Sequence, residues 1–411
     1  MTREKAKPRM QSRECKIRFA FCILGVAFCI IPGRQVALSS SPDQAKAIAE
    51  IKRLGGTIER DEQAPNKPVV EIVLSQSRFT DDQLPLLNSF DKLESLALNK
   101  YITDKGLLHL RKHRQLRSLQ MGGAKITDQG LVHLKELQEL RLLNLSHTSP
   151  QITDKGLAQL KALPHLQNLW LRGTGITDAG LIHLQEMKEL SSLALYGPKI
   201  TDAGLIHLRN MDRLDWLDLD GTAITTAGLA NLKGLKSLYA LDLSRTNVTD
   251  AGLVHLQSLA ELQLLELHST GIGNAGLAYL AKVGKLRRLG LGRTQITDAG
   301  LEHLKGLTHL EELDLGSTKI TGDGLSSVAE ISRLKRLQLS GCRITDAKLV
   351  YLQKLPHLEW LDLTDTQITD AGLIHLHQLT RLERLDLRLN KVTQMGKQQL
   401  KKALPKLEIN L

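Results

Sequence analysis

The sequence predicts an α/β fold in the form of a right-handed solenoid, with parallel strands on a concave face and helices on a convex face. An isoleucine or valine recurs at an almost constant spacing, leucines alternate with other residues just before it, and Thr-Asp-x-Gly-Leu usually follows it. Repeats of this length stack on their neighbours instead of forming separate globules. The spacing is 24 residues, with one of 26, and the recurring positions are Ile102, Ile126, Ile152, Ile176, Ile200, Ile224, Val248, Ile272, Ile296, Ile320, Ile344, Ile368 and Val392.

Residues 1–39 are predicted to be a signal peptide or a signal anchor. A basic region extends to Arg18, thirteen mostly apolar residues follow from Phe19 to Ile31, and small residues surround Leu38. This order is typical of a secretory signal. Thirteen helical residues rise only about 20 Å, which is short for the roughly 30 Å hydrocarbon core of a membrane. We therefore favour a cleaved signal and keep an uncleaved anchor as the alternative.

Residues 40–68 are predicted to form an N-terminal cap helix and a linker. A helix over 42–54 would place Ile48, Ile51 and Leu54 on one face, and two glycines would then end it. Such a cap is expected because the first repeat would otherwise expose its core edge to water. After a polar stretch, residues 69–411 are predicted to be a solenoid of about 14 repeats and about fifteen strands.

The unit at residues 214–224 illustrates how each repeat is expected to fold. Leu217 and Leu219 alternate with Trp216, Asp218 and Asp220, which predicts a short strand with the leucines inward. The Thr222 hydroxyl is expected to bond backbone in the turn, as part of a ladder through neighbouring copies. In Ile-Thr-Asp-x-Gly-Leu, Thr or Asp is expected to cap a helix whose inner face carries leucines at spacings of three.

These repeats closely resemble the leucine-rich-repeat superfamily, specifically its ribonuclease-inhibitor-like and cysteine-containing F-box-type branches, whose units follow LxxLxLxxCxxITDxGLxxL. The resemblance covers Val69 to Leu411. Most copies have Thr in place of the family's Cys, whereas Cys342 and Asn390 are the more usual choices. The resemblance implies a leucine-rich-repeat solenoid, or horseshoe, that binds other proteins. Together with the N-terminal segment, it makes the chain similar to exported bacterial proteins built from this repeat.

Charge and cysteine content exclude several classes of function. The formal charge is +11, but residues 1–38 hold eight Lys or Arg and two Glu, which leaves +5 spread thinly over the repeats. Nucleic-acid binding therefore loses its main support. Only Cys342 lies within the repeats, so no disulfide framework or cysteine metal site is expected there.

Large aromatic residues at outward strand positions are the candidate partner-binding patch. Trp170, Tyr196 and Trp216 fall in three consecutive repeats, and Tyr239 begins the next. Exposed aromatic side chains are enriched at binding hot spots, although scattered surface aromatics are also common. The patch is therefore a hypothesis, with a functionless surface as its alternative.

A row of acidic residues flanks these aromatics at the middle outward position. The row comprises Asp218, Asp242, Glu266, Asp314, Asp362 and Asp386, and it is joined by Asp215 and Asp220. Carboxylates repeated at strand spacing need counter-charges or a cationic partner. Arg288, Arg336 and Arg384 supply some towards the C-terminus, whereas the stretch near Trp216 is expected to have fewer. We therefore add Asp218, Asp242 and Glu266 to the candidate partner-binding residues.

Neither of the two recurring polar motifs predicts catalysis or metal binding. Seven histidines share one helical position, but other residues interrupt the row and no carboxylate recurs at ligand spacing. The Thr-Asp pairs are explained by helix capping, since Thr226, Asn274 and Gln394 replace the Asp in some copies. The histidines are His109, His133, His183, His207, His255, His303 and His375.

The predicted function is a non-catalytic protein–protein interaction scaffold that binds a protein partner on its concave face. It is expected to be secreted, periplasmic or at the cell surface, without catalytic residues, cofactor or metal. No nucleic-acid partner is expected, and a membrane is contacted only through the N-terminal segment if that segment is uncleaved. The alternative function is an F-box-like substrate-recognition subunit of a ubiquitin ligase, against which stands the lack of an F-box helical segment before the repeats.

Overall fold

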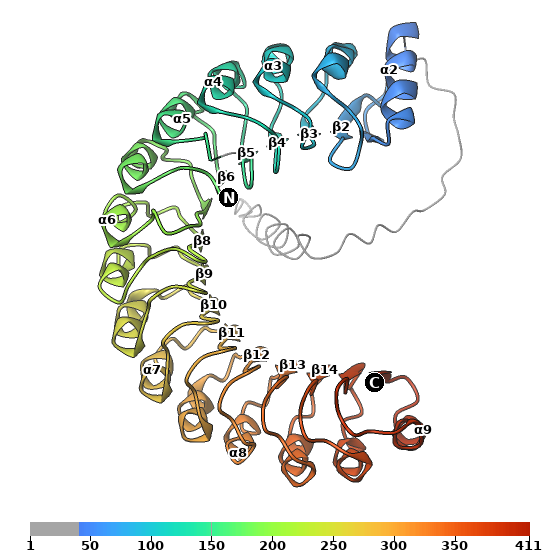
Figure 1. Ribbon diagram of the computed structural model, residues 1–411, viewed down its shortest axis with the longest axis vertical. Helices are drawn as coiled ribbons and strands as arrows, with labels where there is room; N and C mark the ends of the chain where they lie inside the picture. Colours follow the sequence, from blue (N-terminus) through green and yellow to red (C-terminus); the bar gives the residue numbers. More distant parts are fainter. Residues whose placement is uncertain (1–40, 149) are drawn as a thin grey trace, which may run out of the picture. The chain divides into compact units, whose positions relative to one another are not determined.

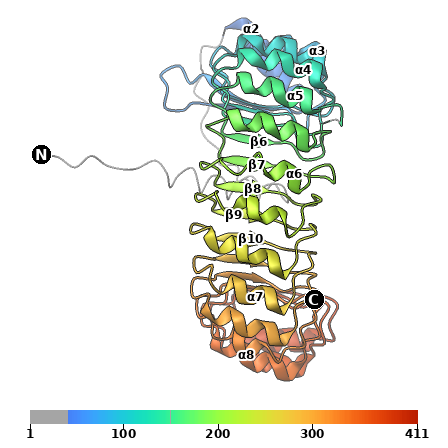
Figure 2. The same ribbon diagram turned by 90° about the vertical axis from the view of Figure 1, so that its left-hand side faces the viewer.

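The computed structural model describes residues 41–148 and 150–411, which belong to one unit, Ser41–Leu411. The predicted signal segment lies outside the described residues. Within the unit, strands lie along the inner side of an arc and helices along the outer side (Figure 1). Viewed from the side, the strands stack one above the other like rungs (Figure 2). The predicted α/β solenoid, with strands on the concave face and helices on the convex face, is confirmed.

One sheet of 16 strands, in sequence order, runs through the described residues. Every strand from β2 onwards pairs in parallel with the next, and only β1 is antiparallel. The strands are β1 (Thr57–Arg60), β2 (Val69–Val73), β3 (Ser95–Ala97), β4 (Ser118–Gln120), β5 (Leu142–Asn144), β6 (Asn168–Trp170), β7 (Ser192–Ala194), β8 (Trp216–Asp218), β9 (Ala240–Asp242), β10 (Leu264–Glu266), β11 (Arg288–Gly290), β12 (Glu312–Asp314), β13 (Arg336–Gln338), β14 (Trp360–Asp362), β15 (Arg384–Asp386) and β16 (Glu408–Asn410).

The sequence period sets the register of this sheet. Leu217 pairs with Leu241 and Leu241 with Leu265, 24 residues apart each time. Where the spacing is 26, Leu143 still pairs with Leu169, so the two extra residues are accommodated in the loop. Equivalent residues of successive repeats therefore form straight columns across the inner face.

Short helices cover the outer side, and many are 3₁₀ (η) rather than α. A 3₁₀ helix has three residues per turn, which matches inward leucines at spacings of three such as Leu181 and Leu184, both fully buried. The helices are α2 (Pro42–Arg53), η2 (Asp81–Ser89), α3 (Asp104–Leu107), η3 (Leu108–Lys112), α4 (Asp128–Leu131), η4 (Val132–Glu136), α5 (Asp154–Gln159), η5 (Leu160–Ala162), η6 (Asp178–Glu186), α6 (Asp202–Leu205), η7 (Gly228–Leu232), η8 (Asp250–Ser258), α7 (Asn274–Leu280), η9 (Asp298–Gly306), α8 (Leu325–Val328), η10 (Asp346–Lys354), η11 (Asp370–Leu376) and α9 (Gln394–Ala403).

The N-terminal end of the core is covered by α2 and by a strand that the sequence analysis missed. Ile51 of α2 is fully buried, and Ile48 and Leu54 pack partly buried against the same core. Residues 57–60, assigned to the linker, instead form β1, which pairs with β2. The strand is short and only half-buried, so its alternation of polar and apolar residues gave a weak signal.

Most Thr-Asp pairs at the helix starts also join two repeats. The Thr201 hydroxyl accepts from the Ala203 amide (3.3 Å) and donates to Asp178 Oδ2 of the preceding repeat (2.6 Å). The Thr201 amide also donates to Asp178 Oδ1 (2.7 Å). At this helix capping accounts for part of the threonine's role, whereas the aspartate bonds the next repeat, which was not predicted. Thr177, Thr249, Thr297 and Thr345 precede 3₁₀ helices without a side-chain capping bond.

The turn threonines do not form the expected ladder of bonds between repeats. Thr222 Oγ1 donates to the Leu219 carbonyl of its own repeat (2.6 Å), and Thr246 and Thr270 do the same in theirs. The longer Asn390 side chain instead reaches the Leu363 carbonyl of the preceding repeat (2.6 Å). Bonding of the turn backbone is confirmed, but it stays within each repeat where the residue is Thr.

Candidate functional site

Two columns of side chains face outward from the strands of the inner sheet. We call the column that contains Trp216 the first column and the column that contains Asp218 the middle column. Residues of each column are about 4.8 Å apart along the sheet because they lie on adjacent strands. From β6 to β15 the middle column is Trp170, Ala194, Asp218, Asp242, Glu266, Gly290, Asp314, Gln338, Asp362 and Asp386.

The four candidate aromatic residues lie in consecutive repeats but at different positions across the sheet. Trp170 is in the middle column and Trp216 in the first, while Tyr196 follows β7 by two residues and Tyr239 precedes β9. Tyr196 is the most exposed of them, at 39% of its surface, and the other three are half-buried. The aromatics therefore form a diagonal band rather than one compact patch.

The small residues between the two tryptophans project less far from the sheet than their neighbours on the same face. Ala194 stands between Trp170 and Asp218 in the middle column and is buried, although it points away from the leucine core. Ser192, beside Trp216 in the first column, is also buried. Their larger neighbours on adjacent strands cover them, so this part of the inner face is packed and not open to solvent.

Asp218 is buried and paired, contrary to the expectation that it awaits a cationic partner. Its side chain is 1% exposed and accepts a hydrogen bond from Arg172 Nε (2.8 Å). Arg172 reaches it from two strands away, across β7, and also lies 3.6 Å from Asp220. A second arginine, Arg245, donates from Nε to Asp220 Oδ1 (2.7 Å).

Glu266 is also neutralised within the chain. Arg288 Nε lies 2.6 Å from Glu266 Oε1, and His268 Nε2 lies 2.9 Å from Oε2. Although burial lowers it, the pKa of His268 is raised overall by the hydrogen bond and charge of Glu266 and by the charge of Asp314. The Gly292 amide donates to His268 Nδ1 (3.1 Å), which fixes the ring's orientation.

Asp242 differs from its neighbours in the middle column. Burial and the charge of Asp218 raise its pKa to about 7, against opposing hydrogen bonds from Ser244. The Ser244 amide donates to its Oδ1 at 2.8 Å. Within the described part of the chain, Asp242 forms no ion pair, so it carries the least compensated charge of Asp218, Asp242 and Glu266.

The expected shortage of basic neighbours around Trp216 is therefore wrong. Arg172, Arg245 and His268 supply counter-charge from the turns that follow their strands, not from the two columns. Like positions in adjacent repeats do not reveal this pairing, because its two residues are 46 apart in the sequence. The sequence feature that could have indicated this pairing is Arg172 itself, which follows the middle-column residue of its own strand by two positions.

Towards the C-terminus the arginines expected to neutralise the acidic row pair mainly within the first column, and only Arg288 reaches a member of that row, Glu266. Arg288 and Arg336 both approach Glu312 between them (3.4 and 3.8 Å), and Arg384 approaches Glu408 (3.5 Å). These pairs are largely exposed, so each contributes little to stability.

The repeated histidines do not converge on a site. His303 is exposed and the other six are half-buried beside buried leucines. Arg111 donates to His133 Nδ1 (2.7 Å), which links two repeats. Across residues 41–148 and 150–411, His, Cys, Asp and Glu side chains nowhere gather in groups of three that could hold a metal ion.

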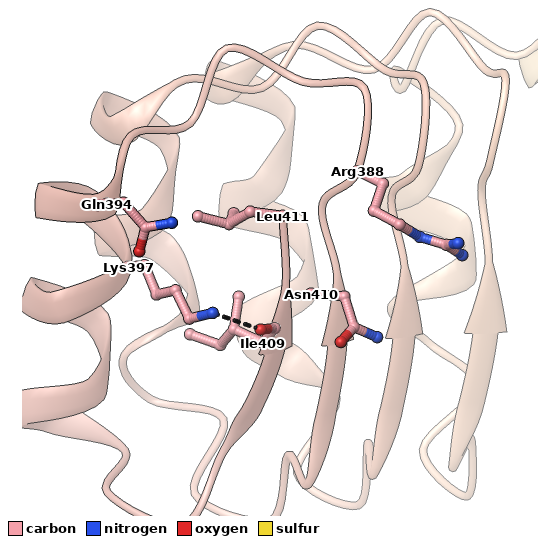
Figure 3. A pocket seen from close by; sticks show the side chains of 6 residues that line it. All are labelled: Arg388, Gln394, Lys397, Ile409, Asn410 and Leu411. Carbon is pink, nitrogen blue, oxygen red and sulfur yellow. Dashed lines mark hydrogen bonds between the residues drawn. The ribbon is translucent and has the colours of Figure 1, made fainter.

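An open hollow of about 480 Å³ lies at the C-terminal end, between α9 and β16. Figure 3 shows Lys397 extending from α9, with its Nζ donating to the Ile409 carbonyl (2.8 Å). Arg388, Gln394, Asn410 and Leu411 complete the lining. The hollow is shallow and distant from the aromatic band, so it adds nothing to the candidate site.

Comparisons with known proteins agree with this geometry. The family model described as leucine rich repeat matches residues 284–344 and 332–392. No curated protein sequence matches significantly. In the described residues, no helix combines the length and apolar content needed to cross a membrane.

Solved structures with a similar fold include bacterial and plant proteins. Internalin InlF of Listeria monocytogenes is 22% identical with a TM-score of 0.57, and the match covers 90% of this chain and 94% of that one. The ectodomain of the Arabidopsis receptor kinase HAESA, in complex with an IDA peptide hormone, is 18% identical (TM-score 0.54; 90% and 65% covered). The functional domain of InlJ from Listeria monocytogenes is 18% identical (TM-score 0.52; 82% and 71% covered). With its repeat pattern, its in-register sheet and these matches, the chain has the leucine-rich-repeat fold, and residues 284–392 match the leucine-rich-repeat family model itself.

Proposed function

We propose that this protein is a non-catalytic scaffold that binds a protein or peptide partner on its concave face. One observation carries the proposal. The inward residues of the strands are nearly always leucine, whereas the outward residues of the first and middle columns differ from strand to strand. Because the fold does not depend on the outward side chains, these can vary to form a specific binding surface without loss of stability. A rigid surface also loses little conformational entropy on binding.

Tyr196 is the centre of the proposed contact surface because its position is fixed before binding. The Arg245 guanidinium lies over its ring, 5.7 Å from the centroid, and Arg245 is held in turn by Asp220. Gly221, at φ +66°, lies directly under the ring, where a Cβ atom would collide with it. An exposed aromatic side chain held in this way is suited to act as an anchor for a partner.

The partner's chemistry follows from what remains accessible. Asp218 and Glu266 are neutralised internally, so a strongly basic partner is not required. Tyr196, Trp216 and Arg245 offer apolar and hydrogen-bonding surface, and Asp242 adds a carboxylate that ionises near neutral pH. We propose a protein or peptide segment with an apolar side chain for Tyr196 and a polar group near Asp242. The HAESA ectodomain, which holds a peptide hormone, is a precedent for this ligand class.

The proposed location is outside the cytoplasm: secreted, periplasmic or at the cell surface. The proposal rests on residues 1–39, whose basic, apolar and small-residue regions follow the order of a signal sequence. N-terminal sequencing of the protein from its native cells tests it. A mature N-terminus close to residue 40 is the expected result, and full-length chain in the cytoplasm would contradict it.

The binding proposal is tested by comparing two tyrosine variants of the full chain. Tyr196→Ala removes the fixed ring on the inner face, whereas Tyr101→Ala removes a similarly exposed ring (46%) in the turn after β3. Proteins captured from the native envelope fraction are identified, and their affinities for both variants are measured by titration calorimetry. Affinity should fall at least about tenfold for Tyr196→Ala, as for a hot-spot residue, and stay unchanged for Tyr101→Ala. Equal binding by both variants would refute the concave-face proposal.

A further inference from the structure

An exposed apolar stripe runs along the outer side of the central repeats. In five consecutive repeats, the second and fifth helix positions are both apolar and exposed, for example Ala203 and Ile206. Ile182 and Ile206 are 47% and 45% exposed, and Val254 is 40% exposed. We call this set the outer stripe: Ala179, Ile182, Ala203, Ile206, Ala227, Ala230, Ala251, Val254, Ala275 and Ala278.

The outer stripe has two parallel rows, one of small and one mainly of large side chains. The two residues in each repeat are three apart, so they lie one behind the other along the helix. The helices are seen end-on in Figure 1, so they run across the stripe. Alanines therefore form a row near the helix starts, and Ile182, Ile206 and Val254 stand in a row nearer the helix ends.

The edges of the outer stripe carry opposite charges. Asp178, Asp202 and Asp250 begin their helices and line one edge. Arg209, Lys233 and Lys282 lie exposed beyond the ends of α6, η7 and α7 and line the other edge. The stripe is thus uncharged along its middle, acidic on one side and mainly basic on the other, where Glu186 at the end of η6 is paired with Lys161.

We propose that the outer stripe is the contact surface for a second copy of this chain. The sizes of the side chains in the two rows and the charges of the two edges each favour the same two-fold arrangement of the copies. A two-fold axis that lies in the contact plane and runs along the stripe places the large row of one copy on the alanine row of the other. The same axis places the acidic edge of one copy against the basic edge of the other. An axis across the stripe would instead oppose isoleucine to isoleucine and aspartate to aspartate.

This back-to-back dimer is compatible with binding on the concave face, because the two surfaces lie on opposite sides of the repeats. Isologous two-fold contacts are the commonest form of self-association. Because two convex surfaces curve away from one another, contact is confined to a few repeats, which agrees with the uninterrupted run of five repeats that carry both apolar residues. The same pair recurs farther along, in Ala347 with Val350 and Ala371 with Ile374, beyond two repeats that lack it. The dimer would present two concave faces outward and raise the avidity for a repeated partner.

Sedimentation of the full chain over a range of concentrations tests the dimer. The wild-type chain should show a concentration-dependent dimer, and Ile182→Lys with Ile206→Lys should weaken it at least about 100-fold, because unpaired charges would be buried. The matched control is Ile374→Lys, at the same repeat position but outside the outer stripe and 62% exposed. It should leave the dimer unchanged. A monomer at all concentrations, or a dimer that survives the double substitution, would overturn the proposal.

Cysteine cross-linking tests the symmetry without relying on a disruptive variant. In chains with Cys15, Cys22 and Cys29 replaced by serine, Ala203→Cys and Ile206→Cys are introduced separately. The proposed axis brings position 203 of one copy opposite position 206 of the other, within disulfide reach. Mixing the two variants should therefore give the mixed disulfide faster than either variant links to itself. Preferred self-linking of Ile206→Cys would overturn the arrangement, as would a monomer that uses Ile182 and Ile206 to bind phosphatidylglycerol vesicles.

Discussion

Replacing Asp242 with asparagine should stabilise the protein most above pH 7 and progressively less as the pH falls towards 4. Asp242 stands between Asp218 and Glu266 in the middle column. A unit charge about 5 Å away contributes roughly 3 kcal/mol at an effective dielectric constant of about 20, before its counter-ion is considered. Arg172 and Arg288 compensate the two neighbours but do not pair with Asp242. Asparagine keeps the size of the side chain and an oxygen that can accept from Ser244.

The magnitude follows from the pKa of Asp242, which burial and Asp218 raise from 3.8 to about 7. A rise of about three pKa units corresponds to about 4 kcal/mol of lost stability at high pH, an upper bound because neighbouring carboxylates share the effect. Between about pH 4 and pH 7 the folded state holds more protons than the unfolded state, so wild-type stability falls as the pH rises. We expect Asp242→Asn to gain about 1–3 kcal/mol at pH 8 relative to pH 5.

Urea unfolding of wild type and variant at pH 5 and pH 8 measures this difference, because titrations elsewhere cancel between the two chains. The control is Asp386→Asn in the same column. Although burial opposes it, hydrogen bonds from Arg388 lower the pKa of Asp386. The stability that Asp386 contributes is therefore lost only below its unfolded pKa of about 4, and Asp386→Asn should cost the same at pH 5 and pH 8. If Asp242→Asn were neutral or destabilising at pH 8, the reasoning about the middle column would be refuted.

Three further predictions concern the contacts between and within repeats. Asp178→Ala should cost about 2 kcal/mol in urea unfolding because it leaves the Thr201 amide and hydroxyl without their acceptors, whereas Thr226→Asp should gain up to about 1 kcal/mol by completing the ladder where it is interrupted. Gly204→Ala should cost at least about 2 kcal/mol, since its Cβ would collide with Asp178 and lie 2.8 Å from Leu181 Cδ1, while Gly306→Ala, with open space around it, should be neutral or slightly stabilising. Thr222→Val should lower stability by about 1 kcal/mol, because the Leu219 carbonyl loses its donor, and an unchanged melting temperature would contradict that bond.

The fold was predictable because one physical requirement recurs with every repeat. A unit such as residues 214–237 cannot bury Leu217 and Leu219 alone, so it must stack on its neighbours, and the period then fixes the register Leu217–Leu241–Leu265. The ends were harder to predict. The strand β1 pairs only with β2, and its four residues carry no repeated pattern from which a partner could be inferred.

The candidate site was only partly predictable, for the opposite reason. Placing Asp218 and Asp242 side by side required only the period, and the structure has them in adjacent strands. The pairing of Arg172 with Asp218 depends on a side chain that crosses β7, which is possible because small Ala194 stands between Trp170 and Asp218. Such contacts depend on the sizes of three side chains together, so they cannot be inferred from any single position of the repeat.

The buried pair of Arg172 and Asp218 is better explained by geometry than by stability. Burying two charges costs about as much free energy as their attraction returns, and an apolar pair would serve the fold as well. The pair instead fixes the positions of neighbouring side chains. Arg172 contacts Asp218 and Asp220, Asp220 holds Arg245, and Arg245 lies over Tyr196, so the network links four successive repeats. If Tyr196 is the anchor for a partner, Arg172→Met combined with Asp218→Asn should preserve most of the stability, because no unpaired charge is left buried, yet reduce affinity, since the ring would lose the support that fixes it before binding.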